Sequence, residues 1–168
     1  MRRLLSIKVR NHPGVLSHVA GLFTRRAFNI ESIAAGPTED PSITRIHLVA
    51  QGDEQQLDQV TKQIRKLIDV LEVEPLSYAG AVTRELVLIT VYSTYDNRRD
   101  ILLLCDSLGA RVVDLSSKAV TIEFAGNERQ VNNAVRMMER FGIKQMARTG
   151  MIALPFESIL EEGRETMS

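Results

Sequence analysis

The fold is most clearly indicated by residues 11–33, which read NHPGVLSHVAGLFTRRAFNIESI. Asn11 is expected to form an Asx-type turn, and Pro13 suits the first helical position because its missing N–H costs nothing there. Gly14 has no side chain, so another molecule can approach the backbone closely at that point. The stretch therefore predicts a loop, a helix that begins near Gly14, and a strand that begins near Asn29.

The start of this helix is a candidate anion site. The backbone N–H groups of Gly14, Val15 and Leu16 have no acceptor within a helix, and they point out of its N-terminus. Together with the helix dipole they favour a bound carboxylate. An ordinary helix start remains the alternative interpretation of these residues taken alone.

Hydrophobic periodicity extends the prediction through the first half of the chain. Alternation of apolar and polar residues predicts strands, and apolar residues repeating every three or four positions predict helices. Asp53 is a plausible N-cap for the second helix. The expected elements are a strand at 5–10, a helix at 15–23, strands from 29 and at 45–50, a helix with an apolar stripe at 57–68, and a strand at 70–76.

The second half repeats this order of elements. The expected elements are a strand at 86–91, a helix at 96–108, a hairpin at 112–124 that turns around Ser116-Ser117-Lys118, a helix at 131–141 and one last strand within 143–154. Two βαββαβ units predict an α+β protein with two ferredoxin-like domains. We expect the domains at residues 1–78 and 82–156, followed by a frayed tail at 157–168.

Composition excludes several classes of protein. Lys+Arg and Asp+Glu both number 21, so the formal net charge is zero and neither nucleic acid nor an anionic membrane is indicated. The single cysteine, Cys105, agrees with a reducing cytoplasm, and no apolar run is long enough to span a membrane. Domains this small have marginal cores and leave one sheet face uncovered, so we expect a cytoplasmic oligomer.

A series of short motifs runs through most of residues 1–154. They are, in order, Asn11-x-x-Gly14-x-Leu16, Gly21-Leu22-Phe23, Phe28-Asn29-Ile30-Glu31-Ser32-Ile33, Gly36-Pro37-Thr38-Glu39-Asp40-Pro41, Lys62-Gln63-Ile64-x-Lys66-Leu67-Ile68-Asp69-Val70, Arg84-Glu85-Leu86 and Ala147-Arg148-Thr149-Gly150. In order and spacing they resemble the small regulatory subunit of acetolactate synthase (acetohydroxyacid synthase). The first half also resembles an ACT domain, a family that dimerises and binds free amino acids at the junction between protomers.

The resemblance implies a regulatory function in branched-chain amino acid biosynthesis. It implies a large catalytic subunit as partner, which is activated, and feedback inhibition by an effector that is usually valine. Thiamine diphosphate, Mg²⁺ and FAD are expected in that partner, and no cofactor is expected in this chain.

The implied effector site lies at the junction of an ACT homodimer. Backbone N–H groups at Gly14, Val15 and Leu16 would hold the carboxylate. Asn11 and Asn29 are implied as ligand contacts, with the second arriving from the neighbouring protomer, and Leu16 and Ile30 would form an apolar wall. Which branched-chain amino acid binds is left open, because one methylene changes affinity by only about 1 to 3 kcal/mol.

The residues themselves do not build a catalytic or metal site. Gly52-Asp53 is followed by Glu54 rather than the glycine of a thiamine-diphosphate motif, and the three histidines have no second ligand at metal spacing. Cys105 lies on an apolar helical face and is expected in the core. Glu85 could serve as half of an acid–base pair, but no second carboxylate is placed against it by spacing.

Other functions remain as alternatives. A free-standing ACT-type amino-acid sensor would share only the first half of the chain. An acylphosphatase-type hydrolase would turn over substrate without a partner, and a metal-responsive DNA-binding regulator would need a basic N-terminal element and a His/Cys cluster. The chain departs from the family where Arg26-Ala27-Phe28 replaces Arg-Gly-aromatic, since a glycine there would permit a positive φ that Ala27 disfavours.

Overall fold

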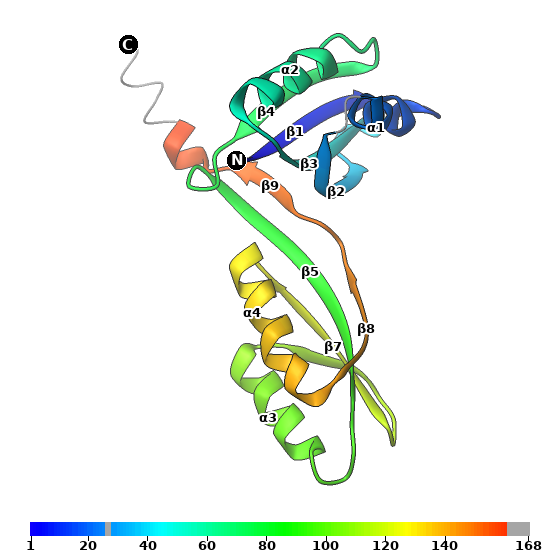
Figure 1. Cartoon of the computed structure of the whole chain (residues 1–168), viewed down its shortest axis with the longest axis vertical. Coiled ribbons are helices and arrows are strands. Elements are labelled where there is room, and N and C mark those ends of the chain that lie inside the picture. The colour runs from blue at the N-terminus through cyan, green and yellow to red at the C-terminus, as the bar shows by residue number, and fades with distance from the viewer. Residues whose placement is uncertain (26–27, 161–168) are drawn as a thin grey trace. The chain divides into compact units, whose positions relative to one another are not determined.

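The structure is a computed structural model, and it describes residues 1–25 and 28–160. Its described residues form two compact units (Figure 1). The first unit contains the described residues within 1–82 and 151–160, and the second contains residues 83–150. The chain therefore passes out of the first unit and later returns to it.

The first unit has a four-stranded antiparallel sheet and two helices. Its elements are β1 (Arg2–Arg10), α1 (Val15–Arg25), β2 (Asn29–Pro37), β3 (Ile43–Gln51), α2 (Glu54–Ile64) and β4 (Val70–Leu76). The sheet order is β2-β3-β1-β4, so the two central strands, β3 and β1, are flanked by edge strands β2 and β4. Helices α1 and α2 cover one face of this sheet (Figure 1). The predicted βαββαβ order is confirmed.

Alternating side chains explain the core between helices and sheet. Apolar residues of one strand face meet the apolar stripes of both helices, and they are almost completely buried: Leu5, Ile7, Val9, Val15, Val19, Phe23, Ile46, Leu48, Ala50, Leu57, Val60 and Ile64. Asp53 caps α2 as predicted, because its carboxylate accepts the Gln56 N–H at 2.8 Å and the Gln56 side chain returns to the Asp53 N–H. The predicted stripe extends too far, since α2 ends at Ile64 and Ile68 is 88% exposed.

The second unit repeats the arrangement. Its elements are β5 (Ala81–Tyr92), α3 (Arg98–Leu108), β6 (Arg111–Leu115), β7 (Ala119–Gly126), α4 (Glu128–Met138), a short 3₁₀ turn (Glu139–Phe141) and β8 (Ile143–Arg148). The order β6-β7-β5-β8 matches that of the first sheet, strand for strand. Helices α3 and α4 lie on one face, over a core that includes Cys105 as predicted (Figure 1). Two ferredoxin-like units are therefore present.

The single strand predicted within residues 143–154 is wrong. The structure has two strands there, β8 and β9 (Ile152–Pro155), and they are separated at Gly150, which has a φ of +81°. β8 belongs to the second unit, whereas β9 belongs to the first and pairs with the beginning of β5. Residues 151–155 therefore lie outside the unit in which the sequence placed them, because a local pattern does not specify which sheet a strand joins.

Strand β9 brings apolar residues to the face of the first sheet opposite its helices. Met151 and Ala153 from the end of the chain, with Ala81, form a small buried cluster with three residues of that face, Leu4, Val49 and Leu76. The ring Nε2 of His47 lies 2.8 Å from the Ala153 carbonyl oxygen, and burial lowers the pKa of His47. A neutral His47 therefore donates its Nε2–H to that carbonyl. This sheet face, which we expected to meet water or a partner, is covered in part by the chain itself.

Some expectations concern the ends of described segments. Residues 157–160, the beginning of the expected frayed tail, are helical. Residues 161–168 lie outside the described residues, as do Arg26 and Ala27. The departure from the family pattern at Ala27 therefore lies outside the described residues as well.

Candidate functional site

The loop before α1 has the geometry of an open helix N-terminus. Helix α1 begins at Val15, and the His18 N–H donates to the Gly14 carbonyl oxygen at 3.0 Å. Gly14 has a φ of +89°, a left-handed conformation that favours glycine, and a Cβ added there would meet no atom within 4 Å. Pro13 lies in the turn that precedes the helix rather than at its first position. Gly14 therefore faces open space.

The three residues that offer backbone N–H groups differ in where their side chains lie. Val15 is 4% exposed and packs in the first core, so only its backbone can contact a ligand. Leu16 is 48% exposed, although it is a large apolar residue beside the helix start. Within the described residues, the N–H groups of Gly14, Val15 and Leu16 donate to no acceptor. These N–H groups can donate to a bound anion. The Leu16 side chain can contact an apolar group of the same ligand.

Asn11 does not form the predicted Asx-type turn. Its side-chain Nδ2 instead donates to the Pro41 carbonyl oxygen at 3.1 Å, and its backbone N–H donates to the Ser42 carbonyl oxygen at 2.8 Å. The loop before α1 is thus tied to the turn between β2 and β3. Because Nδ2 is engaged there, and Asn11 is an exposed residue, its Oδ1 is the atom that could accept from an ammonium group.

Asn29 and Ile30 lie at the other end of the same sheet. Asn29 is paired in register with Gln51, which is paired with Arg2, whereas Asn11 follows Arg10 at the far end of β1. Eight residues of strand separate Arg2 from Arg10, a distance of about 26 Å at about 3.3 Å per residue. Asn29 is exposed and its Nδ2 lies 3.3 Å from Gln51 Oε1, while Ile30 is partly buried against the core. One chain therefore does not bring all six predicted ligand residues together.

Two histidines and an aspartate, which the sequence analysis treated separately, converge beside the helix start. His12 Nε2 lies 2.6 Å from Asp69 Oδ1, and His18 Nδ1 lies 3.8 Å from Asp69 Oδ2. The other His12 nitrogen, Nδ1, lies 3.2 Å from the Pro13 carbonyl oxygen. The hydrogen bond to Pro13, with that to Asp69, raises the pKa of His12. His12 thus anchors the loop that carries Gly14 to the residue preceding β4.

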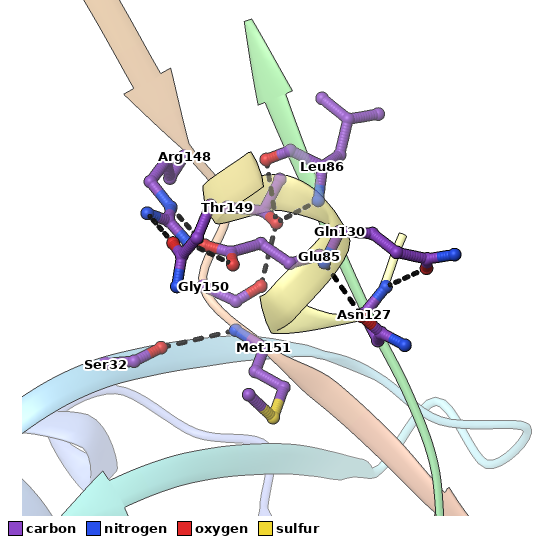
Figure 2. A network of polar contacts seen from close by, with 10 residues as sticks. Ser32, Glu85, Leu86, Asn127, Gln130, Arg148, Thr149, Gly150 and Met151 are labelled. Atoms are coloured by element: carbon purple, nitrogen blue, oxygen red, sulfur yellow. Dashed lines mark hydrogen bonds and ion pairs between the residues drawn. The ribbon is translucent and has the colours of Figure 1, made fainter. Parts of the chain in front are cut away.

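A second polar network lies in the second unit and contains the two later motifs (Figure 2). Arg148 of β8 forms a bidentate pair with Glu85 of β5, at 2.8 Å from Nε and 2.7 Å from Nη2. Its Nη1 also donates to Asn132 Oδ1 on α4, at 2.9 Å. Hydrogen bonding to Glu85 raises the pKa of Arg148. Glu85, which sequence reasoning left without a partner, is therefore part of a structural ion pair and not of an acid–base pair.

The residues after Arg148 complete this network. Thr149 Oγ1 accepts the Leu86 N–H at 3.0 Å, and the Thr149 N–H donates to the Leu86 carbonyl oxygen at 3.0 Å (Figure 2). Gly150 follows with its positive φ, where a side chain would be strained. The motifs Arg84-Glu85-Leu86 and Ala147–Gly150 thus describe one joint between neighbouring strands.

The described residues contain no group of three or more His, Cys, Asp or Glu side chains that could hold a metal ion. Burial raises the pKa of the Cys105 thiol, which is typical of a core cysteine rather than of a nucleophile. None of the described helices is long and apolar enough to cross a membrane.

Two family models match the chain, one in each half. Residues 5–72 match the AHAS small subunit-like ACT domain, and residues 84–156 match the small subunit of acetolactate synthase. The first match includes the open start of α1, and the second includes the Glu85–Arg148 network.

Known proteins resemble the chain over most of its length. A probable acetolactate synthase small subunit from Methanothermobacter thermautotrophicus is 42% identical over 152 residues, which is 90% of each protein. The acetolactate synthase small subunit of Aquifex aeolicus is 40% identical over 98% of this chain and 86% of its own. The crystal structure of the small subunit from Thermotoga maritima superposes with a TM-score of 0.86 at 32% identity, covering 93% of this chain and 98% of that one.

Proposed function

This chain belongs to the family of acetolactate synthase small subunits, and from that premise we propose that it activates a catalytic subunit and confers feedback inhibition by valine. The catalytic subunit would carry thiamine diphosphate, Mg²⁺ and FAD, and the complex would act in the cytoplasm in branched-chain amino acid biosynthesis. This chain would carry no catalytic residue.

The observation that supports this proposal most directly is the open N-terminus of α1. The N–H groups of Gly14, Val15 and Leu16 would hold the carboxylate of the effector, with about 0.3 to 1 kcal/mol from the helix dipole. Asn11 Oδ1 would accept from its ammonium group. The exposed side chain of Leu16 would contact the branched side chain of valine.

The edge strand β2 supports a site shared between two chains. Its outer edge has no partner strand among the described residues, and residues 32–37 carry no charge. If two copies pair antiparallel through β2 about a two-fold axis centred at Ile33, Asn29 of the second copy lies beside Pro37 of the first. Pro37 is paired in register with Thr44, and Thr44 is paired with Val9, which lies two residues before Asn11. Such a dimer would bring Asn29 and Ile30 to the helix start that they cannot reach within one chain.

Inhibition would then follow from a shift between two arrangements of the subunit. A ligand that contacts both copies binds best when the two copies hold one particular geometry, so it favours that geometry over others. The activity of the catalytic subunit would depend on which of the two arrangements the small subunit adopts. Valine would act to the extent that its affinity differs between the two arrangements.

Thermal unfolding of the purified chain with each of the twenty amino acids tests the effector site. Valine, leucine or isoleucine should raise the melting temperature by several degrees, because ligand at 100 times its dissociation constant stabilises the folded state by about 2.7 kcal/mol. Reconstitution with the catalytic subunit should then raise its activity and make it sensitive to the same amino acid. A shift only with an unrelated amino acid would favour the alternative, a free-standing amino-acid sensor.

The shared site predicts a particular behaviour of mixed variants. Asn11→Ala and Asn29→Ala chains should each fail to bind valine alone, since every site in either dimer lacks one asparagine. A heterodimer of the two has one site with both asparagines intact. After random mixing about one quarter of all sites should therefore bind valine again, as calorimetry would measure. Binding that stays absent in the mixture would contradict a site built by two chains.

A further inference from the structure

The His12 side chain contacts two hydrogen-bond acceptors at once. Its ring Nε2 lies 2.6 Å from Asp69 Oδ1, and its ring Nδ1 lies 3.2 Å from the Pro13 carbonyl oxygen. A carboxylate oxygen and a carbonyl oxygen can only accept hydrogen bonds, whereas a neutral imidazole has a single N–H to donate. Only the imidazolium form of His12 therefore satisfies both partners.

A neutral His12 ring would have to give up one of these contacts. If Nε2–H stays on Asp69, the lone pair of Nδ1 faces the Pro13 carbonyl oxygen and repels it. If Nδ1–H stays on Pro13, the lone pair of Nε2 faces the Asp69 carboxylate instead. Either loss loosens the loop that presents the Gly14 N–H at the open start of α1, because Pro13 directly precedes Gly14.

Asp69 makes the charge of His12 matter as well as its hydrogen bonds. The Asp69 side chain is only 12% exposed, and its ion-pair partners among the described residues are both histidines, His12 at 2.6 Å and His18 at 3.8 Å. Because these two histidines flank Gly14 in sequence, the Asp69 carboxylate lies beside the helix start where we propose that the effector carboxylate binds. Without the charge of His12, Asp69 would repel that carboxylate, since water and salt screen partly buried charges much less than exposed ones.

Groups on the surrounding elements act on the charge of this ring. Its hydrogen bond to the backbone carbonyl and that to Asp69 raise the pKa of His12, whereas partial burial and the charge of Arg10, at the end of β1, oppose them. His18 of α1 lies against Asp69, and Asp40, in the turn between β2 and β3, accepts hydrogen bonds within that turn. The imidazolium form of His12 is therefore present at low pH and is lost as the pH rises through this raised pKa.

We propose that the imidazolium of His12 is a positioning residue of the effector site, so that effector binding is coupled to the uptake of a proton by His12. The inference rests on the proposed function, because it concerns the same site at the start of α1. The effector would bind tightly when His12 is protonated and more weakly when it is neutral. Because such coupling is reciprocal, the bound effector would also favour the protonated form of His12.

Isothermal titration calorimetry of the full-length chain with valine tests this coupling. The dissociation constant should rise about five- to tenfold between about pH 6 and about pH 8.5, a range in which valine largely keeps both of its charges. Titrations in buffers of different ionisation enthalpy should show that at most about one proton is taken up for each valine bound. Saturating valine should raise the pKa of His12 by nearly one unit in an NMR titration, since about one pKa unit corresponds to a tenfold change in affinity.

Two substitutions of His12 separate the effect of its charge from that of its hydrogen bonds. His12→Arg keeps a positive charge and several N–H donors at every pH, so it should bind valine tightly and with little dependence on pH. His12→Gln has no charge, so it should bind valine at every pH about as weakly as the wild type does at high pH. His18→Gln is the matched control, because His18 lies 3.8 Å from the same carboxylate and is 65% exposed. It should keep the pH profile of the wild type.

Circular dichroism should show that all three variants are folded, as expected for exposed positions. Wild-type binding of valine that does not change with pH would overturn this inference and leave the proposed function intact. A His12→Arg protein that keeps the wild-type pH profile would overturn the inference as well, because another group would then take up the proton. Absence of valine binding at every pH would overturn the effector site itself, and this inference with it.

Discussion

Arg148→Met is expected to lower the free energy of unfolding of the second unit by about 3 kcal/mol. The substitution leaves the Glu85 carboxylate, whose side chain is only 7% exposed, without the guanidinium that forms two hydrogen bonds with it. It also removes the donor to Asn132 on α4. We place the loss at the lower end of the range for buried pairs because the Arg148 side chain is 32% exposed and water reaches it.

Urea unfolding measures this loss, and two further variants isolate its cause. Lys8→Met breaks the exposed Lys8–Glu72 pair, also 2.8 Å long, and should cost less than about 1 kcal/mol. Glu85→Gln combined with Arg148→Met removes both charges and should recover a large part of the stability that Arg148→Met loses. An Arg148→Met protein as stable as the Lys8→Met protein would show that the network contributes little. A double variant no better than Arg148→Met would assign the loss to packing of the arginine stem instead.

Local patterns predicted most of the elements in the fold. β4 was predicted at residues 70–76 and occurs there, and the capping of α2 by Asp53 follows from three neighbouring residues. Such features depend on side chains that are close in sequence. The prediction extended the apolar stripe of α2 to Ile68, because apolar residues keep a helical spacing in the sequence after the helix itself has ended. Ile68 is in fact exposed.

Contacts between residues far apart in sequence account for what the sequence could not predict. Glu85 meets Arg148, 63 residues later, and His12 meets Asp69, 57 residues later. β9 belongs to the first unit, although β8, which precedes it in the chain, belongs to the second. No local pattern of Ile152–Pro155 indicates which sheet the strand joins. Opposite charges and strand register could have suggested these pairs only after the strand order was known.

The candidate effector site was predicted in part. The open helix start at Gly14 followed from local rules, and the structure gives it the positive φ that only glycine adopts freely. The Asn11 side chain was predicted to hydrogen-bond within its own loop. It donates instead to the carbonyl oxygen of Pro41, which lies in a turn distant in sequence. The separation of Asn29 from Asn11 could not be inferred from spacing, because the register of β1, β2 and β3 determines it.

Gly14→Asp is expected to abolish valine inhibition while activation of the catalytic subunit is retained. The new carboxylate would stand where we propose that the carboxylate of valine binds, and like charges placed next to each other cost several kcal/mol. The valine concentration for half-inhibition should therefore rise at least about 100-fold, equivalent to nearly 3 kcal/mol. No atom lies within 4 Å of the added Cβ, so the fold can accept the side chain. The φ of +89° should cost about 1 to 2 kcal/mol of stability.

Gly109→Asp is the control for that loss of stability. Gly109 also has a positive φ, of +72°, and open space around its Cβ, but it ends α3 in the second unit. It should lower the melting temperature about as much as Gly14→Asp and leave valine inhibition intact. The asparagine side chain of Gly14→Asn has the shape of the aspartate in Gly14→Asp but no charge, so this variant should weaken valine inhibition less. Inhibition of Gly14→Asp at wild-type valine concentrations would exclude the start of α1 as the carboxylate site, because no carboxylate could bind there beside another.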